Sequence, residues 1–198
     1  IDIVEPESGS LPHLAVTGDS AAWIPLDWSP DDRKLLVLKY VSISEAYLYV
    51  VDLGSGQKRE VEPSPNKVGI AGAKFSRDGQ GVYLISDRDG EFAQLRYVNL
   101  FTGESSVISG RLSWGIEELA ISRDGHYLAY LGNEAGISKL NVLDLRAHQD
   151  LVLPKLPAAG VIDSLSFDAT GNRLAFSFAA ANKPRDAYVL DIAANRLE

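Results

Sequence analysis

The sequence contains no cysteine and no methionine among its 198 residues. Without cysteine, disulfide bonds and thiolate metal sites are excluded, and a cytoplasmic and an exported (periplasmic) location both stay open. No apolar stretch of about 18 residues and no signal-peptide pattern occurs, so we expect no membrane segment. Because methionine is missing even at position 1, we expect the chain to begin inside a longer gene product.

Positive charge is also in short supply. Lys and Arg total 19 against 27 Asp and Glu, which gives a formal net charge of −8. A nucleic-acid-binding protein needs a basic field to displace counterions, so we expect no nucleic-acid partner. The hydrophobic content of 45% and the charged content of 23% are ordinary for a globular protein. No segment shows a helical pattern of useful length.

What the sequence does contain is a short motif that recurs four times. Its second position falls at residues 29, 76, 122 and 168, so the spacing is 47, 46 and 46 residues. The four copies are Trp28-Ser29-Pro30-Asp31-Asp32, Phe75-Ser76-Arg77-Asp78-Gly79, Ile121-Ser122-Arg123-Asp124-Gly125 and Phe167-Asp168-Ala169-Thr170-Gly171.

Each copy has the chemistry of a turn between two strands. Ser or Asp at the start can hydrogen-bond the backbone ahead, and Gly at the end accepts the left-handed conformation at little cost. Asp32 stands where the other copies have Gly79, Gly125 and Gly171. We therefore predict a positive φ at Asp32, at a cost of about 1 kcal/mol.

Four strands are expected in each repeat. Continuous apolar runs such as Leu35–Leu38 and Val82–Ile85 follow the turns, and continuous runs suit strands covered on both faces. A second signature, such as Tyr49-Val50-Val51-Asp52-Leu53, and a weaker fourth strand come next. A repeat of about 40 to 50 residues with four strands is typical of a β-propeller blade. The fold class predicted is all-β, a partial β-propeller of about four blades.

The repeat predicts where the blades begin and end. Residues 1–20, with a weak apolar segment from Leu11 to Val16, would be the end of a preceding blade. Blades one to three would span 21–62, 67–110 and 111–154, and an incomplete blade four would span 157–198. An arc cut from a larger ring would leave blade edges open, so self-association is expected.

No catalytic constellation is found. Gly18-Asp19-Ser20-Ala21-Ala22 is the nearest match to a serine hydrolase elbow, but Ala replaces the second Gly and Pro25 follows too soon for a helix. Asp87-Arg88-Asp89-Gly90 lacks the further ligands of a calcium loop. The three histidines are scattered. We expect no catalytic residue, no metal site and no cofactor.

The loops between the second and third strands are the predicted functional face. They span 41–46, 87–91, 132–137 and 179–186, at the opposite end from the repeated turns, and they vary in length and carry charge. Variable loops on a rigid frame commonly carry recognition. The substrate-binding candidates are Glu45, Arg88, Asp89, Glu134 and Arg185.

Blade one also resembles a known family. The segments 26–32, 38–49 and 51–53 resemble the N-terminal propeller of prolyl oligopeptidase family serine peptidases, in the dipeptidyl peptidase and acylaminoacyl peptidase branch. Leu84–Gly90 followed by Gln94-Leu95 is typical there, although periplasmic TolB-like propellers share it. Propellers of this family commonly have about seven or eight blades, so the chain would be roughly half of one.

The resemblance implies a non-catalytic role. In that family a C-terminal α/β-hydrolase domain carries a Ser-Asp-His triad, and the propeller admits short peptides and lends charged residues to the substrate terminus. No triad motif occurs here, so no catalytic role is carried over to this chain. Glu45, between the second and third strands of blade one, is the nearest candidate for such an anchor. The expected partners are that hydrolase domain and short peptides. The alternative is a TolB-like scaffold that binds proteins with no enzyme attached; a sugar- or metal-dependent propeller enzyme would need clustered carboxylates or histidines, which are missing.

Overall fold

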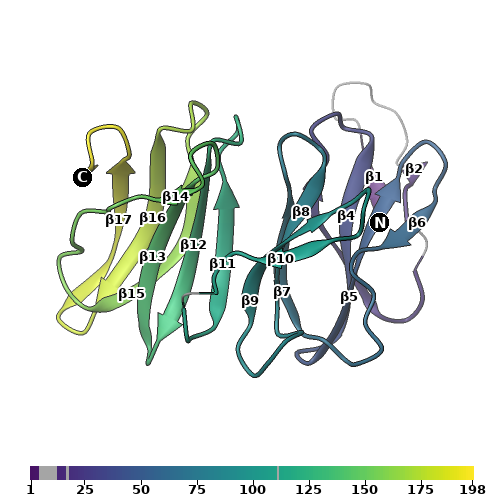
Figure 1. Ribbon diagram of the computed structural model, residues 1–198, viewed down its shortest axis with the longest axis horizontal. Coiled ribbons are helices and arrows are strands. Elements are labelled where there is room, and N and C mark those ends of the chain that lie inside the picture. Colours follow the sequence, from purple (N-terminus) through teal and green to yellow (C-terminus); the bar gives the residue numbers. More distant parts are fainter. Residues whose placement is uncertain (5–12, 17, 111) are drawn as a thin grey trace.

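The computed structural model describes residues 1–4, 13–16, 18–110 and 112–198. It contains four antiparallel sheets of four strands, here called blades, which stand side by side along the long axis (Figure 1). Each blade is an up-and-down meander from an inner to an outer strand. The strands are β3 Ala22–Trp28, β4 Lys34–Ser42, β5 Glu45–Asp52 and β6 Lys58–Glu60; β7 Ile70–Phe75, β8 Gly81–Ser86, β9 Gln94–Asn99 and β10 Ser105–Val107; β11 Ile116–Ile121, β12 Tyr127–Glu134, β13 Ile137–Asp144 and β14 Gln149–Asp150; β15 Gly160–Phe167, β16 Arg173–Ala180, β17 Lys183–Asp191 and β18 Arg196–Leu197.

The blades lie within the ranges expected from the repeat. Blade four was expected to be incomplete; its outer strand, β18, has two residues and pairs with β17 through Leu190 and Leu197. The predicted start of blade three at Arg111 lies outside the described residues. No helix long and apolar enough to cross a bilayer occurs in the described parts of the chain.

The repeated turns have the predicted geometry. The amide of Gly79 donates to the carbonyl of Ser76 at 3.0 Å, and the Ser76 hydroxyl accepts the amide of Gly81 at 2.8 Å. The positive φ predicted for Asp32 is confirmed at 56°, next to values of 70° to 77° for the three equivalent glycines. The turn residue of blade one is thus a non-glycine residue in the left-handed region.

Replacing Asp32 with glycine is expected to raise the free energy of unfolding by about 0.5 to 1 kcal/mol, because glycine adopts this φ without steric cost. The matched variant is Gly79→Asp, which is expected to lose a similar amount. A Cβ at Gly79 would meet no atom within 4 Å, so its effect is conformational only. Urea denaturation followed by tryptophan fluorescence measures both, and a loss of stability in Asp32→Gly would contradict the account of the turn.

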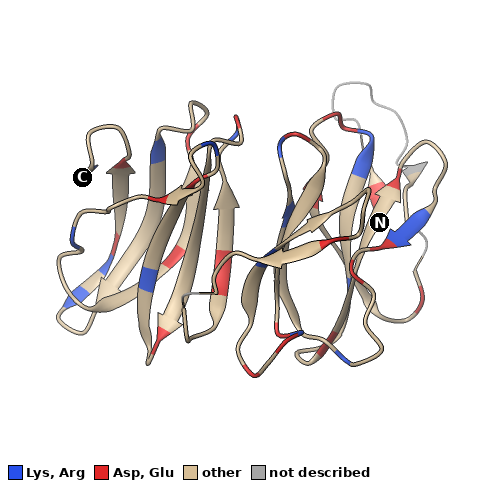
Figure 2. Cartoon of the chain, viewed as in Figure 1, with Lys and Arg blue, Asp and Glu red and all other residues tan. Residues whose placement is uncertain are grey.

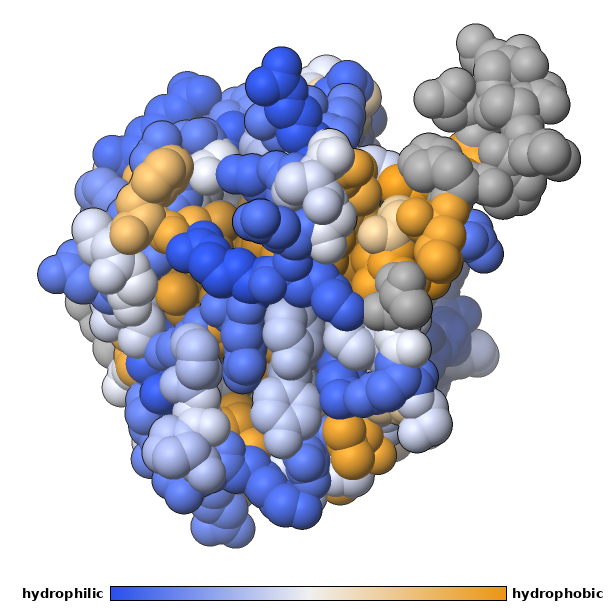
Figure 3. Space-filling view, turned by 90° about the vertical axis from the view of Figure 1, so that its right-hand side faces the viewer, coloured by the Kyte–Doolittle hydropathy of each residue, from blue (hydrophilic) through white to orange (hydrophobic). Residues whose placement is uncertain are grey.

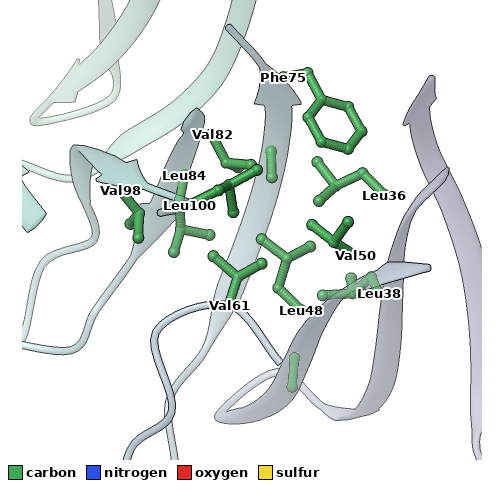
Figure 4. Packing of buried hydrophobic residues seen from close by; sticks show 12 residues of the cluster. Leu36, Leu38, Leu48, Val50, Val61, Phe75, Val82, Leu84, Val98 and Leu100 are labelled. Atoms are coloured by element: carbon green, nitrogen blue, oxygen red, sulfur yellow. The ribbon is translucent and has the colours of Figure 1, made fainter. Parts of the chain in front are cut away.

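Hydrophobic clusters between neighbouring blades form the core. The cluster between blades one and two is the one drawn in Figure 4, and Leu36, Leu48 and Phe75 are among its members. Both faces of β8 are buried, as the continuous apolar run predicted. β16 differs, since it alternates between buried and more exposed residues. One face of blade four has no sheet packed on it, so burial there follows the period of two expected for a strand with one covered face.

Every inner strand contains a register shift in its pairing with the second strand. The shifts fall between Pro25 and Asp27, Ile70 and Gly72, Ile116 and Glu118, and Asp163 and Ser166. A bulge adds local twist and leaves backbone groups out of the ladder. The inner strands of adjacent blades contact one another, so these bulges lie where the four blades converge.

The outer face of blade one is covered in part by the N-terminal residues. β1 Asp2–Ile3 pairs with β2 His13–Leu14, and the amino group of Ile1 donates to the carbonyl of Val16 at 2.9 Å. Of the segment predicted from Leu11 to Val16, residues 11 and 12 lie outside the described residues. Figure 3 views this end of the molecule, where hydrophobic patches show between hydrophilic residues.

Candidate functional site

The predicted functional face does not consist of variable loops. β4 runs to Ser42 and β5 starts at Glu45, so this connection is a two-residue turn. The connections at 135–136 and 181–182 are equally short. Only blade two has a longer loop, from 87 to 93. The loop lengths expected from the sequence were wrong because the polar residues that mark these turns continue into the paired strand ends.

Glu45 lies at the start of β5 and is bound by its neighbours. Its carboxylate contacts the Lys67 ammonium at 2.6 Å and accepts a hydrogen bond from the Tyr47 hydroxyl at 2.9 Å. The bond to Lys67, followed by that to Tyr47, lowers the pKa of Glu45. Both oxygens are therefore engaged, and the anchoring role of Glu45 stays a prediction.

Arg88 and Asp89 belong to a cluster that ties blade one to blade two. The Arg88 guanidinium donates to the carbonyls of Glu62 and Pro63 at 2.7 and 3.1 Å. Asp89 pairs with Arg96, whose side chain also contacts the Glu62 carboxylate at 3.1 Å. The Arg96 and Glu62 side chains are only 7% and 8% exposed. This contact set holds the connection between two blades, which is sufficient to explain these charges.

Glu134 and Arg185 are separated from that cluster. Glu134 pairs with Lys139 across the β12–β13 turn at 3.1 Å. Arg185 pairs with Asp163 on the open face of blade four. The structure brings Arg88 and Asp89 together and leaves the other three candidates on separate blades. Their predicted role in substrate binding is not tested by these positions.

The most polar cavity lies at the opposite end, where the four inner strands meet the repeated turns. This inner-strand pocket has a volume of about 600 Å³ and takes residues from all four blades. Figure 2 shows charged residues of both signs near the strand ends rather than in one block. The lining side chains that carry charge or a large aromatic group are Asp27, Trp28, Asp32, Lys74, Arg77, Arg123, Phe167 and Asp168.

Asp27 organises one side of the inner-strand pocket. Its carboxylate accepts the amide of Phe75 in the next blade at 3.0 Å. Lys74 lies 3.7 Å and Arg77 3.8 Å from the same carboxylate, and the Lys74 ammonium donates to the carbonyl of Leu26 at 3.2 Å. Asp27 thus links the β3 bulge of blade one to the end of β7 in blade two, and it holds two cations beside the cavity.

Glu118 has the equivalent role between blades three and four. Its carboxylate accepts the amides of Ser164 and Leu165 at 3.0 and 2.7 Å. Ser164 has a positive φ of 63°, so two successive amides of the β15 bulge point at one carboxylate. Hydrogen bonds to a charged acceptor are stronger than neutral ones. Glu118 therefore stabilises a strained backbone in its neighbour.

Arg77 is one of the groups in this region with spare hydrogen-bonding capacity. Its side chain lines the inner-strand pocket and a second cavity of about 600 Å³ between blades two and three. Its contact with Asp27, at 3.8 Å, is too long for a hydrogen bond. Its buried Nε has no hydrogen-bond partner among the described residues. An arginine fork in this state can accept a carboxylate in two parallel bonds.

The other ionisable groups at this end serve the turns and the core. A hydrogen bond from the Ser122 hydroxyl lowers the pKa of Asp124, and one from the Thr170 hydroxyl lowers that of Asp168. Burial raises the pKa of Tyr83, in the second cavity, to about 12. These groups are held in one protonation state near neutral pH, so none of them is poised to exchange a proton.

The structure offers no hydrolytic machinery in the described residues. Ser20 precedes β3 rather than a helix, so it does not sit on a nucleophile elbow. His126 lies against Tyr127 and contacts Asp144 at 3.2 Å. Among described residues, no three His, Cys, Asp or Glu side chains come close enough to hold a metal ion.

Comparison with known proteins identifies the fold. No family model and no curated protein matches the sequence. Among solved structures, TolB from Acinetobacter baumannii matches over 96% of this chain and 46% of its own, with 16% identity and a TM-score of 0.73. The chain is a partial β-propeller. A puromycin-hydrolyzing peptidase from Mycobacterium tuberculosis matches over 96% of this chain and 30% of its own, with 19% identity and a TM-score of 0.74.

The propeller therefore spans less than half the length of either of these two structures. At such identities the likeness shows the fold alone. Both TolB and peptidase structures contain this fold, so the likeness does not choose between them.

Sequence reasoning missed the inner-strand pocket for a definable reason. The repeated turns look uniform in sequence, so the sequence predicts only a structural role for them. The signal was present in the positions that break the repeat: Asp27, Lys74, Ala120 and Ser166 are equivalent, yet only the first two are charged. Charged residues at the inner-strand end of two adjacent repeats indicate a polar site where the blades converge.

Proposed function

We propose that this propeller is the non-catalytic part of a serine peptidase, where it restricts access to a separate α/β-hydrolase domain and anchors the terminus of short peptides. The observation that supports this most is the inner-strand pocket, which Arg77 lines and where its contact with Asp27, at 3.8 Å, is too long for a hydrogen bond. Peptidase structures among the matches, including a puromycin hydrolase and the tricorn protease, provide the fold-level support.

The pocket has the chemistry to hold a peptide by its carboxylate end. Arg77, Lys74 and Arg123 supply positive charge, while Trp28, 42% exposed, supplies an apolar surface for a side chain. Asp27 lies at similar distances from Lys74 and Arg77, 3.7 and 3.8 Å, so the planar guanidinium of Arg77, which can form two parallel bonds, makes it the first candidate for the carboxylate. This moves the proposed anchor from the second-to-third-strand turns to the end with the repeated turns.

Binding of the tripeptide Gly-Gly-Leu and of its C-terminal amide tests this anchor. We expect the free acid to bind more tightly, and Arg77→Ala to weaken it by about tenfold, as for the loss of a charge-assisted hydrogen bond. Arg173→Ala is the matched control, since Arg173 lies outside the pocket. Isothermal titration calorimetry measures both ligands on the unchanged protein and on the two variants. Equal affinities for the acid and the amide would overturn the proposal, and so would hydrolysis of dipeptidyl chromogenic substrates by this chain alone.

The alternative is a TolB-like interaction propeller with no enzyme attached. The match to TolB, which covers more of that chain than of the peptidases, supports it. The coding sequence beyond Glu198 separates the two. Further blades followed by a Gly-x-Ser-x-Gly elbow favour the peptidase, and a protein without a hydrolase domain favours the interaction scaffold.

A further inference from the structure

The outer edge of β13 carries unpaired backbone groups. The amide of Leu145 donates to the carbonyl of His126, just before β12. The backbone N–H and C=O groups of the odd-numbered residues of β13 therefore point toward β12, and those of the even-numbered residues point outward. Of the outward groups, the Val142 carbonyl accepts the amide of Leu151 at 2.8 Å. Beyond this point, the outward N–H and C=O groups of Leu140 and Ser138 have no partner in the described part of the chain.

Blade one shows how the same edge is closed elsewhere in the molecule. There the carbonyl of Leu48, which is equivalent to Leu140, accepts the amide of Val61 at 2.8 Å. The amide of Ala46 donates to the carbonyl of Val68, also at 2.8 Å. The connection to the next blade thus covers the edge, and the cavity left beside it measures only about 20 Å³.

Blade two closes its edge in a similar way. The carbonyl of Leu95 accepts the amides of Ile108 and Ser109 at 2.8 and 3.3 Å, and its amide donates to the Ser109 hydroxyl at 2.9 Å. The Ala93 carbonyl then accepts the amide of Ile116 at 2.8 Å. Blade three is therefore the exception among the three blades that are followed by another.

Two residue changes contribute to the open edge. Pro154 stands at the position of Ser109, and proline has neither the amide hydrogen nor the hydroxyl that closes the edge in blade two. The hydroxyl of Ser138 accepts the amide of Ile162 at 2.9 Å, a role that the backbone carbonyl of Ala93 has one blade earlier. The carbonyl of Ser138 is thereby released.

An apolar groove of about 410 Å³ runs beside this open edge. Its floor consists of large hydrophobic side chains from blades three and four: Leu140, Leu153, Leu156, Phe176, Leu190 and Leu197. Lys155 and Lys139 are the cations among its lining residues. Lys155 is exposed and has no partner among the described residues, and Lys139 has a half-exposed side chain that pairs with Glu134.

We propose that this groove binds an extended peptide segment, which adds to β13 as an antiparallel strand. The free groups of Leu140 and Ser138 supply the main-chain hydrogen bonds of strand addition, and the groove takes alternate apolar side chains. Lys139 points to the opposite face of the strand from Leu140, so an acidic residue between two apolar ones complements it. The site is distinct from the inner-strand pocket and does not depend on the proposed function.

The probe is the peptide acetyl-Thr-Leu-Glu-Val-Thr-amide, whose Leu and Val would lie opposite Leu140 and Ser138. Amide hydrogen exchange, followed residue by residue by NMR, reports directly on the edge. At a peptide concentration of ten times Kd, exchange of the Leu140 and Ser138 amides is expected to slow by about tenfold. The same peptide with N-methyl groups on Leu and Val cannot donate to the edge and is expected not to protect them.

Two variants locate the site independently. Ala158→Trp fills the groove, since Ala158 lines it, and is expected to abolish protection. Lys155→Glu is expected to weaken binding several-fold, whereas the charge-matched control Lys183→Glu, outside the groove, leaves it unchanged. Circular dichroism verifies that each variant is folded. If Ala158→Trp does not fold, Lys155→Glu and the N-methylated peptide still test the proposal.

Several results would overturn the proposal. No slowing of exchange at Leu140 and Ser138 at any peptide concentration is one. Equal protection by the N-methylated peptide is another, because the edge would then have no part in binding. Protection that rises with protein concentration in the absence of peptide would assign the edge to a second copy of the chain.

Discussion

Replacing Arg96 with alanine is expected to lower the free energy of unfolding by about 3 to 5 kcal/mol, because the buried Glu62 carboxylate loses its nearer cation and keeps only the Arg88 guanidinium at 4.0 Å. The Arg96 guanidinium contacts Glu62 at 3.1 Å, donates to the Ser105 hydroxyl at 2.8 Å and pairs with Asp89. Glu62 is only 8% exposed and cannot recover its hydration, whereas Asp89, at 49%, can.

A double variant separates the buried charge from the loss of packing. Arg96→Met combined with Glu62→Leu removes both charges and keeps similar volumes, so it is expected to recover most of the lost stability. Arg146→Ala is the exposed control: its pair with Asp124 is open to solvent, and its loss is expected to cost less than about 1 kcal/mol. Urea denaturation measures all three. A double variant as unstable as Arg96→Ala would contradict this explanation.

Replacing Glu118 with alanine is expected to lower the free energy of unfolding by about 2 kcal/mol, because two backbone amides of blade four lose a charged acceptor. The amides of Ser164 and Leu165 lie at the β15 bulge, and the positive φ of Ser164 adds strain that the carboxylate offsets. Glu118→Gln keeps the size of the side chain and one carbonyl oxygen, so about half of the loss is expected.

The neighbouring residue provides the control for this prediction. Glu117 is exposed and accepts one hydrogen bond from Asn133, so Glu117→Ala is expected to change stability by less than about 1 kcal/mol. Hydrogen exchange adds a local readout, because the Leu165 amide is expected to exchange faster in Glu118→Ala while amides of blade two stay unchanged. Equal effects of the two substitutions would show that Glu118 does not bridge the blades.

The two proposed binding regions follow from departures from the repeat. At the inner-strand pocket, Asp27 and Lys74 stand where blades three and four have uncharged residues. They lie beside Arg77, whose buried Nε has no hydrogen-bond partner among the described residues. At the edge of β13, Pro154 removes the groups that close the edge in blade two. In a repeat protein the shared positions maintain the frame, so positions that differ are free to form sites.

The sequence by itself determined the repeat, the all-β class, the turn at each motif and the left-handed residue at Asp32. These depend on interactions within a few residues, where Ser, Asp and Gly have fixed conformational roles. It also determined that no local hydrolase motif is present.

Only the tertiary structure decided which charges are committed. Arg88 and Asp89 looked available in the sequence, yet Arg88 binds a connection about 25 residues away along the chain and Asp89 pairs with Arg96. The Phe75 amide that Asp27 binds is 48 residues distant, and Glu118 reaches amides 46 and 47 residues away. Such contacts depend on the packing angle of neighbouring blades and on the bulges of the inner strands, which no local pattern encodes. The open edge of β13 became visible for the same reason, because a missing hydrogen bond appears only once its partner strand is in place.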